Sequence, residues 1–410
     1  MKTKHSKRDA ALAIVKHLRR AGHTALFAGG CVRDLQMGLE PKDYDVATDA
    51  VPLRIAELFR RTQQVGAKFG VVIVGQYGHT VEVATFRSDG DYLDGRHPEN
   101  VVFSNPLEDA RRRDFTINGM FLDPLTDQVI DHVGGLEDLR RGLIRAIGDP
   151  QARFVEDHLR MLRAVRFAAR LAFELDGATA DAIVDQAQRI AAISAERIRI
   201  ELLNILTEST RARGWKLMYR LGLANRLIPD LTWTDAEAAD VEARLAALPA
   251  TCSDALALAV LFRKGSPTEA ARWCRRLACS NQQTVAVRWL LDQLPRVMDC
   301  AAFETADFKL LLAQPGADDL AALLAAEIVG RSLSQEPLIV WRERTAQIEP
   351  ASISPERFIT GDDLLTLGMP PGPGVARVLE RLYRRQLNGI IVTRQQALTE
   401  AKALTHGETP

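Results

Sequence analysis

Two aspartates separated by one residue are the first sign of chemistry in this chain. Asp43 and Asp45 flank Tyr44 in a segment, residues 42–48, whose alternation predicts a β-strand. Residues two apart on a strand point to the same face, so the segment would place two carboxylates side by side. Such charges repel unless a cation neutralises them, and Mg²⁺ bound by carboxylates and substrate phosphates is the usual answer. An isolated pair would more simply be solvated in a loop.

A glycine pair precedes the aspartates. Gly29 and Gly30 follow a predicted strand, residues 24–28, and lead into a helix predicted to begin near residue 32. Glycines let the backbone approach a phosphate closely, and the N–H groups at a helix start favour an anion. Arg33, in the first turn, could add a charge-assisted contact. The ordinary alternative for two glycines is a tight turn.

Glu82 is a third acid in the same region. It lies between Val81 and Val83 on a predicted strand whose other residues are mostly apolar. An acid in such a strand is costly without a partner, and a metal ion shared with Asp43 and Asp45 would provide one. A surface acid on an edge strand is the alternative, and we weigh the two equally.

The elements that must position these residues change character along the chain. Before residue 148, strand-like segments at 24–28, 42–48, 71–74 and 80–86 are mixed with helices. Asp149 and Pro150 form a favourable helix start, and nearly every periodic segment from there to about residue 349 is helical. A stretch rich in Pro and Ser, residues 349–355, predicts a boundary before a last small helical unit. The expected fold class is α+β.

The composition restricts the partners and the compartment. The 410 residues contain 53 Lys and Arg against 53 Asp and Glu, so a nucleic-acid partner would need a local basic patch. The five cysteines are an odd number without a CxxC pair, which favours structural thiols in a reducing compartment. No segment has the length of a signal-peptide core or a membrane span. We therefore expect a cytoplasmic protein.

Four groups of residues are specific enough to indicate a family, and they cover roughly residues 20 to 170 in the family's order. They are residues 29–34 (GGCVRD) with 41–48 (PKDYDVAT), 112–119 (RRDFTING), 131–139 (DHVGGLEDL) and 156–167 (EDHLRMLRAVRF). They resemble the GGxVRD…DxD, RRDFT-N, D-x-x-G-G and EDxxRxxRAxRF motifs of class II tRNA nucleotidyltransferases and bacterial poly(A) polymerases.

Two other segments favour the CCA-adding branch of that family. Residues 361–364 (GDDL) and the Pro/Gly-rich turn at 368–374 resemble the tail of that branch. Residues 65–74 are less basic than the RRFRL-like segment that poly(A) polymerases typically carry there. The resemblance implies a polymerase-β-type nucleotidyltransferase head followed by an all-helical neck, body and tail. The implied domains are the catalytic head at 1–145, a neck for base recognition at 146–212, the body at 213–345 and an RNA-binding tail at 346–410.

The resemblance also implies roles for single residues. Asp43 and Asp45 would hold Mg²⁺, and Glu82 would match the family's third acid. Gly30 and Arg33 would contact the triphosphate. Arg113 would contact the nucleotide as well.

The motif at 156–167 offers a physical basis for choosing C and A. The helix predicted from residue 150 carries Asp157, Arg160, Arg163 and Arg166 on one stripe. Cytosine and adenine present an amino donor beside a ring-nitrogen acceptor, whereas uracil and guanine present the reverse. Asp157 only accepts and Arg160 only donates, so the pair would fit C or A and meet U or G with unpaired groups.

This reading agrees with the family's account, in which the Asp and the Arg of the motif read the incoming base. Arg163 would orient that group, and Arg166 would contact the nucleotide too. The ordinary alternative for such a stripe is a solvated face of arginines and glutamates.

The predicted activity is the template-independent addition of CMP and AMP to the 3′ end of tRNA, from CTP and ATP, with release of pyrophosphate. Mg²⁺ is the expected cofactor, and tRNA, CTP and ATP are the expected partners, while neither a membrane nor a protein partner is implied. Poly(A) polymerase and a partial enzyme that adds only CC or only A are close alternatives. A catalytically inactive RNA-binding protein is the alternative from a different class, and the intact Asp43, Asp45 and Arg113 argue against it.

Overall fold

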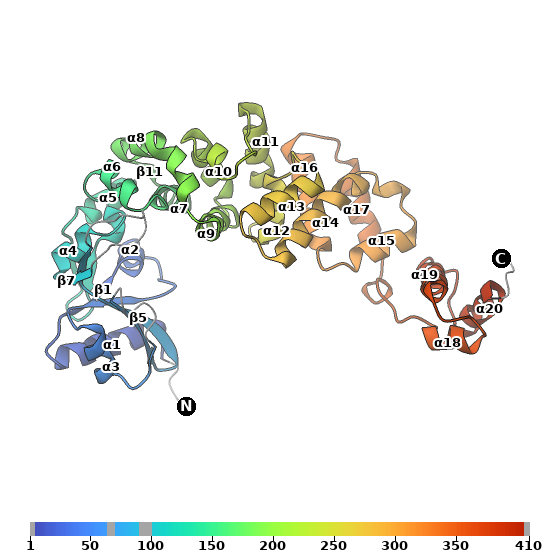
Figure 1. Cartoon of the computed structure of the whole chain (residues 1–410), viewed down its shortest axis with the longest axis horizontal. Coiled ribbons are helices and arrows are strands. Elements are labelled where there is room, and N and C mark those ends of the chain that lie inside the picture. The colour runs from blue at the N-terminus through green and yellow to red at the C-terminus, as the bar shows by residue number, and fades with distance from the viewer. Residues whose placement is uncertain (1–4, 64–69, 90–100, 406–410) are drawn as a thin grey trace. The chain divides into compact units, whose positions relative to one another are not determined.

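The computed structural model describes residues 5–63, 70–89 and 101–405. The chain divides into two units (Figure 1). Unit 1 comprises Met1–Ile205 and Arg213–Trp233, and unit 2 comprises Leu206–Ala212 and Thr234–Pro410. Residues 65–69, which are part of the segment that favours the CCA-adding branch over poly(A) polymerases in sequence, lie outside the described residues.

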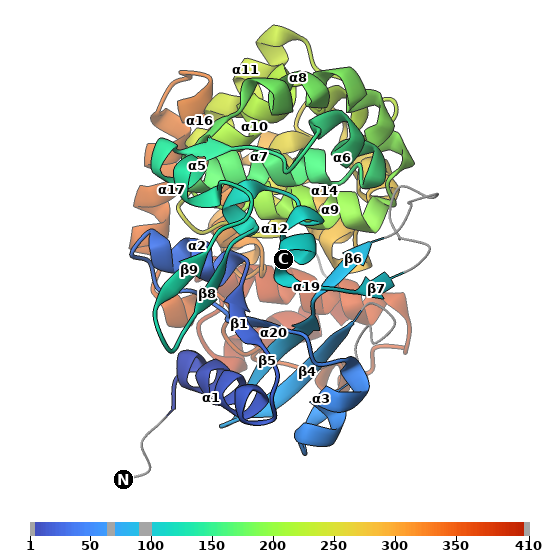
Figure 2. The same cartoon turned by 90° about the vertical axis from the view of Figure 1, so that its left-hand side faces the viewer.

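A seven-stranded sheet organises the first part of unit 1, with strand order β3-β4-β5-β2-β1-β8-β9 (Figure 2). Its strands are β1 (Ala25–Ala28), β2 (Asp45–Thr48), β3 (Thr62–Gln63), β4 (Val71–Gln76), β5 (His79–Thr85), β8 (Phe121–Asp123) and β9 (Gln128–Ile130). Only β2 and β5 pair in parallel, while the other neighbours are antiparallel. The predicted strands at 24–28, 71–74 and 80–86 are thereby confirmed. A separate two-stranded sheet joins β6 (Arg87–Asp89) to β7 (Val101–Phe103).

Helices cover both faces of the sheet. The larger core cluster lies on the face to which Val46, Val81 and Val83 point, and it receives apolar residues from three helices. These are α1 (Lys7–Arg20), α2 (Gly30–Gln36) and α3 (Pro52–Leu58). The smaller cluster, around Ala47 and Phe121 on the opposite face, receives Ala110 of α4 (Pro106–Arg111). Because strand residues alternate between faces, Asp45 and Glu82 both belong to the face of the smaller cluster.

The strand that carries the aspartates is shorter than the alternation predicts. It begins at Asp45, so Asp43 precedes it and the expectation of a strand over 42–48 is wrong for its first three residues. The alternation itself continues upstream, since Tyr44 is buried in the same cluster as Val46 and its ring lies 5.3 Å from that of Phe27. Asp43 and Asp45 therefore still lie on one side of the chain.

The long helix predicted from residue 150 is two helices. Asp149 caps α6 (Pro150–Glu156) as expected, because its carboxylate accepts hydrogen bonds from the N–H groups of Gln151 and Ala152. The helix ends at Asp157, whose backbone is extended and whose carboxylate accepts from Leu159 N–H. A short polar side chain that bonds its neighbouring backbone in this way competes with helix continuation. The single stripe from 157 to 166 is therefore wrong for Asp157, which lies before α7 (Arg160–Leu171).

The rest of unit 1 is helical with one exception. Its elements are α5 (Gly135–Arg141), α8 (Gly177–Gln186), α9 (Ala195–Leu206) and α10 (Arg211–Arg220), apart from the residues of α9 and α10 that belong to unit 2. The two-residue strand β11 (Glu174–Leu175) pairs in parallel with β10 (Leu143–Ile144), which the helical expectation after residue 148 did not include.

The two glycines of the segment 131–139 are required for different reasons: Gly134 has a left-handed backbone, whereas Gly135 is closely packed. Asp131 caps the start of α5 by accepting from the N–H groups of Val133, Gly135 and Leu136. A Cβ atom on Gly135 would clash with the carbonyl oxygen of Thr116. Thr116 also donates to the buried Asp138 at 2.7 Å. The motif therefore locks α5 against the segment 112–119, which lines the site described below.

Unit 2 consists of helices. They are α11 (Asp235–Ala246), α12 (Asp254–Leu261), α13 (Pro267–Arg276), α14 (Asn281–Val297), α15 (Thr305–Leu312), α16 (Ala317–Gly330), α17 (Glu336–Gln347), α18 (Gly361–Thr366), α19 (Pro373–Leu387) and α20 (Arg394–Thr405). The last three share a core cluster of their own, to which apolar residues of α19 contribute as its stripe predicts. This cluster is tied to α15, where Arg384 lies 2.6 Å from Asp307.

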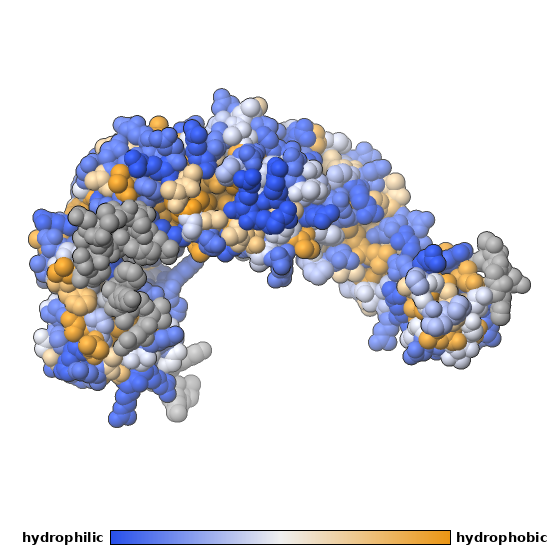
Figure 3. Space-filling model, in the orientation of Figure 1, coloured by the Kyte–Doolittle hydropathy of each residue, from blue (hydrophilic) through white to orange (hydrophobic). Residues whose placement is uncertain are grey.

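The surface and the thiols agree with the composition. On the face drawn in Figure 3, hydrophobic residues form small groups among predominantly hydrophilic ones. Within the described ranges, no helix combines the length and the apolar character that a membrane crossing requires. Cys31, Cys274 and Cys300 are buried free thiols, whereas Cys252 and Cys279 are half-buried free thiols.

Candidate active site

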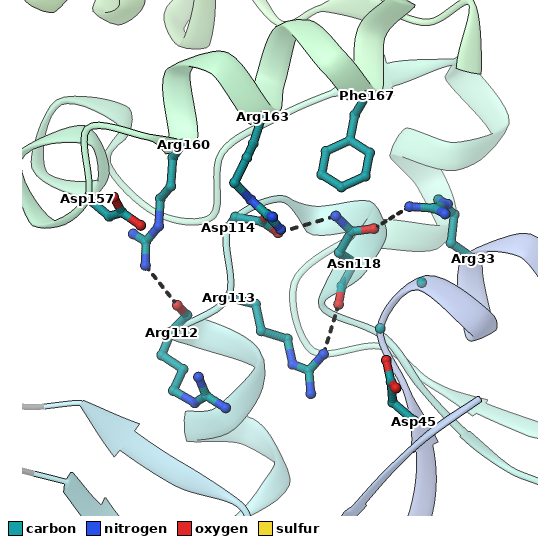
Figure 4. Close-up of a pocket in the computed structure, with 12 residues that line it drawn as sticks. Arg33, Asp45, Arg112, Arg113, Asp114, Asn118, Asp157, Arg160, Arg163 and Phe167 are labelled. Carbon is teal, nitrogen blue, oxygen red and sulfur yellow. Dashed lines mark hydrogen bonds and ion pairs between the residues drawn. The ribbon is translucent and has the colours of Figure 1, made fainter. Parts of the chain in front are cut away.

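A pocket of about 450 Å³ lies in unit 1 where the sheet, the segment 112–119 and α7 meet (Figure 4). Its lining carries five arginines and three aspartates, which makes it strongly polar. The lining residues are Gly29, Gly30, Arg33, Asp45, Arg112, Arg113, Asp114, Asn118, Asp157, Arg160, Arg163 and Phe167.

Most of the residues singled out in the sequence meet in this pocket, although they come from segments more than 100 positions apart. The predicted residues that line it are Gly30, Arg33, Asp45, Arg113, Asp157, Arg160 and Arg163. The predicted residues that do not line it are Asp43, Glu82 and Arg166. Four further lining residues were not predicted as site residues, although all of them belong to the motifs at 112–119 and 156–167: Arg112, Asp114, Asn118 and Phe167.

Asp45 is the acid at the centre of the predicted metal site. Its carboxylate is half-buried at the start of β2 and receives no hydrogen bond or ion pair from any described residue. Burial first and the negative charge of Glu82 second raise the pKa of Asp45 to about 6, while the charge of Arg113 acts in the opposite direction. Glu82 is close because Val46 of β2 pairs with Val83 of β5, which makes the residues before them neighbours. A cation at Asp45 would relieve both effects.

Asp43 is exposed at the edge of this acidic group. Its carboxylate accepts a hydrogen bond of 2.8 Å from Lys7 Nζ, and its charge contributes to the raised pKa of Asp45. In the described ranges, no three acidic, His or Cys side chains are arranged so that they could hold a metal ion together. Mg²⁺ is commonly bound by one or two carboxylates together with substrate phosphates, so the pair Asp43 and Asp45 fits such an ion.

Arg113 lines the pocket near Asp45, and its charge lowers the pKa of that carboxyl group. Its guanidinium donates to Asp109 Oδ2 at 2.9 and 3.1 Å, and to the carbonyl oxygen of Asn118 at 3.3 Å. Burial alone would raise the pKa of Asp109, but Arg113 and Arg112 together hold that pKa below its ordinary value. Gly29 is favoured here because its backbone is left-handed, with φ 72°, and a Cβ atom at this position would also crowd Arg113 Nη1 at 3.0 Å. The glycine turn and Arg113 therefore form one surface suited to a phosphate.

Asn118 connects both sides of the pocket. Its side-chain oxygen accepts from Arg33 Nη1 at 2.8 Å, and its amide nitrogen donates to Asp114 Oδ1 at 3.2 Å. Arg33 is buried and also donates to Asp34 Oδ1 at 2.6 and 2.8 Å. The dashed lines of Figure 4 show Asn118 at the centre of this network. Arg33 is thus held by two partners before any nucleotide binds.

Asp114 anchors the arginine of α7 that faces it. Arg163 donates to Asp114 Oδ2 at 2.6 and 2.9 Å. Burial alone would raise the pKa of Asp114, but the Arg163 charge and these hydrogen bonds lower it to about 2. Asp114 likewise raises the pKa of Arg163. The pair stays ionised, and it positions α7 over the pocket.

The two residues predicted to read the base are each held by a partner of opposite charge. Asp157 accepts from Arg197 Nη2 at 2.9 and 3.1 Å, and Arg160 donates to Glu156 Oε2 at 2.7 Å. Both side chains still line the pocket. Arg197 lies on α9, and nothing local to the 156–167 motif indicates its role. The acceptor and the donor are therefore preorganised, although they do not share one helix.

Arg166 does not line the pocket but pairs with Glu201 of α9. Its Nε lies 2.8 Å from Glu201 Oε2, and its guanidinium carbon lies 4.7 Å from the centroid of the Phe167 ring. Burial lowers the pKa of Arg166. Arg33 and Arg163 also lie over the Phe167 ring, at 5.4 and 5.5 Å. Phe167 thus spaces three arginines apart while it lines the pocket itself.

The repulsion between the acids predicts a shift in the pH profile. In the Glu82→Gln variant, the pKa of Asp45 is expected to fall, because a negative neighbour that favours protonation is gone. The acidic limb of the activity profile should therefore move to lower pH. Turnover on the plateau falls as well if Glu82 itself takes part in the reaction. The measurement is kcat/KM for CTP between pH 5 and about 8. An acidic limb that stays in place would contradict the coupling, and Glu57→Gln, which changes an exposed acid of α3, is the control.

Comparisons with known proteins agree with this arrangement. A family model described as "Poly A polymerase head domain" matches residues 25–145, and one described as "Probable RNA and SrmB- binding site of polymerase A" matches residues 172–234. The CCA-adding enzyme of Lactobacillus johnsonii is 33% identical over 401 residues, which cover 97% of each chain. The CCA-adding enzyme of Geobacillus stearothermophilus is 34% identical over 405 residues, which cover 95% of each chain.

A solved structure extends the likeness to the whole fold. The crystal structure of the Bacillus stearothermophilus CCA-adding enzyme in complex with CTP has a TM-score of 0.82 and is 29% identical, covering 99% of this chain and 100% of that one. This confirms the predicted fold class, a polymerase-β-type head followed by helical domains. Because relatives of about one-third identity match nearly the full length of both chains, the chain belongs to the CCA-adding enzyme family of tRNA nucleotidyltransferases.

Proposed function

We propose that this chain adds CMP and AMP to the 3′ end of tRNA, taking CTP and ATP and releasing pyrophosphate. The observation that carries the proposal is that one pocket holds both the unpartnered carboxylate of Asp45 and the acceptor–donor pair of Asp157 and Arg160. The first suits phosphoryl chemistry, and the second suits the choice of a base without a template. Binding RNA alone would require neither.

The triphosphate is proposed to lie along the glycine turn. Gly29 and Gly30 leave the backbone accessible, Arg113 supplies a guanidinium at the pocket wall, and Arg33 supports this end of the pocket through Asn118. Asp43 and Asp45 would hold a divalent cation, specifically Mg²⁺. When bound, such a cation neutralises phosphate charge and activates the attacking 3′-hydroxyl group.

The base is proposed to face Asp157 and Arg160. Asp157 accepts from the amino group of C or A, and Arg160 donates to the adjacent ring nitrogen. Arg197 and Glu156 hold the two side chains, so little side-chain freedom remains to be lost when the base binds. Arg163 orients the reading end of α7 through Asp114, and Arg166 acts behind it through Glu201.

The four predicted domains would divide the two substrates between them. We propose that the catalytic head (1–145) and the base-reading neck (146–212) act on the nucleotide. The body (213–345) and the tail (346–410) would bind tRNA through shape and backbone charge, because every tRNA must be served. On α19, Arg377 and Arg381 are exposed and suited to this task, whereas Arg385 is paired with Glu400. A protein with these substrates is expected in the cytoplasm.

One incubation tests the proposal. The purified chain is mixed with a tRNA transcript that lacks its CCA end, with Mg²⁺, and with labelled CTP and ATP together or singly. We expect extension by CCA followed by a stop. A long tract of A would identify a poly(A) polymerase, and extension by CC alone or by A alone would identify a partial enzyme. Binding of the transcript without any extension would identify an inactive RNA-binding protein, and each of these results would overturn the proposal.

A further inference from the structure

A second pocket in unit 1, of about 670 Å³, carries positive charge on the opposite side of the sheet from Asp45. We call it the basic pocket. It is formed by α1, by the residues at the end of α3 and by the end of β4, all of which pack on the larger core cluster. Its lining residues are Ala13, Lys16, His17, Arg20, Leu58, Phe59, Arg60, Arg61, Gly75, Gln76 and Tyr77.

The basic pocket contains cations without acids. Lys16, Arg20, Arg60 and Arg61 are exposed, and none of their side chains forms an ion pair or a hydrogen bond with another described residue. No acidic residue is among the described residues that line the pocket. In a chain whose formal net charge is zero, this is a local concentration of positive charge. It is the kind of patch that a nucleic-acid partner requires in a chain of balanced charge.

The site is built on rigid elements. Lys16 and Arg20 are one turn apart on α1, so their side chains emerge from the same face of the helix. The backbone of Arg61 is fixed because its carbonyl oxygen accepts from Gly75 N–H at 2.8 Å. A Cβ atom on Gly75 would lie only 3.2 Å from Arg61 Cβ, so glycine allows this close approach. The four cations therefore converge on one concavity from two segments that are separate in sequence, α1 and the residues that follow α3.

Aromatic rings accompany the cations. His17 lies against the buried Phe59 with ring centroids 4.9 Å apart. Tyr77, which is 50% exposed at the tip of the β4–β5 turn, stacks on His5 with centroids 4.0 Å apart. Flat rings beside guanidinium groups suit the sugars and bases of a nucleic acid as well as its phosphates.

We propose that the basic pocket binds the phosphodiester backbone of RNA. This site is separate from the pocket lined by Asp45, Arg113 and Arg160, which we call the catalytic pocket. None of its lining residues contributes to the catalytic pocket, so the inference goes beyond the proposed function. The contact would increase the affinity for RNA without taking part in the choice of nucleotide. Its strength should depend steeply on salt, because phosphate contacts release counterions.

The test compares two triple variants of the full chain that lose the same charge. The first is Arg20→Gln/Arg60→Gln/Arg61→Gln, and the control is Arg54→Gln/Arg140→Gln/Arg141→Gln, which neutralises exposed arginines of α3 and α5. Each phosphate contact contributes roughly 0.7–0.9 to the slope of log Kd against log salt, so the first variant should lower the slope by about 2. We expect its Kd for a tRNA transcript that lacks the CCA end to rise at least about tenfold at low salt. The control should stay near the wild type.

Two further measurements distinguish RNA binding at the basic pocket from damage to the catalytic pocket and from binding of a free anion. The turnover at saturating tRNA and CTP should be unchanged in the first variant, which shows that the catalytic pocket is intact and that a loss concerns RNA binding alone. The affinity for inorganic pyrophosphate should also be unchanged. If the variant loses pyrophosphate binding but keeps its tRNA affinity, the pocket serves a free anion and the proposal is wrong. It is equally wrong if the slope and the Kd of the two triple variants agree.

Discussion

Nucleotide addition by the Asp45→Asn variant is expected to fall by at least about a thousand-fold, because the proposed metal site would lose its central ligand, and such a site contributes several kcal/mol to transition-state stabilisation. The affinity for tRNA should change by less than about twofold, since the pocket surrounding Asp45 keeps its shape and its arginines. The measurements are single-turnover rates with saturating CTP and the Kd for tRNA. A rate within about tenfold of the wild type would contradict the role of Asp45.

The same substitution should stabilise the metal-free protein. The pKa of Asp45 is raised from 3.8 to about 6 by burial first and by Glu82 second, so the folded state binds the proton more tightly than the unfolded state. The contribution of the protonated carboxyl is fully present below pH 3.8 and is lost as the pH rises through about 6. Above that pH, the Asn side chain avoids the cost of the buried charge, and we expect a gain of about 1–2 kcal/mol in the free energy of unfolding.

Urea unfolding in the presence of a chelator measures this gain at pH 7.5 or so and at about pH 4.5. The gain should shrink towards the lower pH, where Asp45 is protonated in the folded protein. Asp43→Asn is the matched control, because that carboxylate is exposed and paired with Lys7. It should impair nucleotide addition without the gain in stability. A variant at Asp45 that is less stable than the wild type at neutral pH would show that the carboxylate has a partner of structural importance.

Base choice is expected to relax in the Asp157→Ala and Arg160→Ala variants. Each polar pair with a base edge is worth about 1–3 kcal/mol of discrimination, so the preference for CTP over UTP should fall roughly ten- to hundred-fold. Each variant loses an attraction to the right base together with an unfavourable pairing with the wrong one. Contacts to the triphosphate through Arg113 and the glycine turn should persist, and some turnover should remain.

Conservative variants separate base reading from structural support. Asp157→Asn keeps an acceptor and adds a donor, so it should accept U and G better than the wild type while it keeps a similar shape. Arg197→Ala removes the partner of Asp157 without touching the base, and it should slow C and A more than it changes their preference over U and G. Relative incorporation of all four nucleotides under matched conditions shows whether each residue reads the base or supports the structure. Should Asp157→Ala and Arg160→Ala both slow all four bases equally, the bases are read elsewhere.

Local features of this protein were predictable because they depend on neighbours in sequence. The caps and strands are examples: Asp149 caps the N-terminus of α6, and the alternation around Val81 and Val83 corresponds to β5. The spacing within each motif also predicted Arg33, Arg113 and Arg160 as residues of one site, and all three line the same pocket. Where a local pattern misled, as at residue 157, the cause was local too. A carboxylate that bonds the nearby N–H of Leu159 ends a helix that periodicity alone would continue.

Only the tertiary structure decided how those residues are supported. Asn118 joins Arg33 across 85 positions, Asp114 holds Arg163 across 49, and Arg197 holds Asp157 across 40. Periodicity and spacing carry no information about such pairs, because the partners are brought together by the packing of α2, α7 and α9 around the segment 112–119.

The same distinction applies to charge. The sequence by itself determined that the chain has no net charge and that an RNA surface must be a local patch. It also identified the acids of the predicted metal site, yet only the fold shows that burial and Glu82 raise the pKa of Asp45. The basic pocket could not be predicted at all, since its cations come from α1 and from the residues after α3, which only the fold brings together with the end of β4. Electrostatic free energy depends on distance and burial in space, and a sequence states neither.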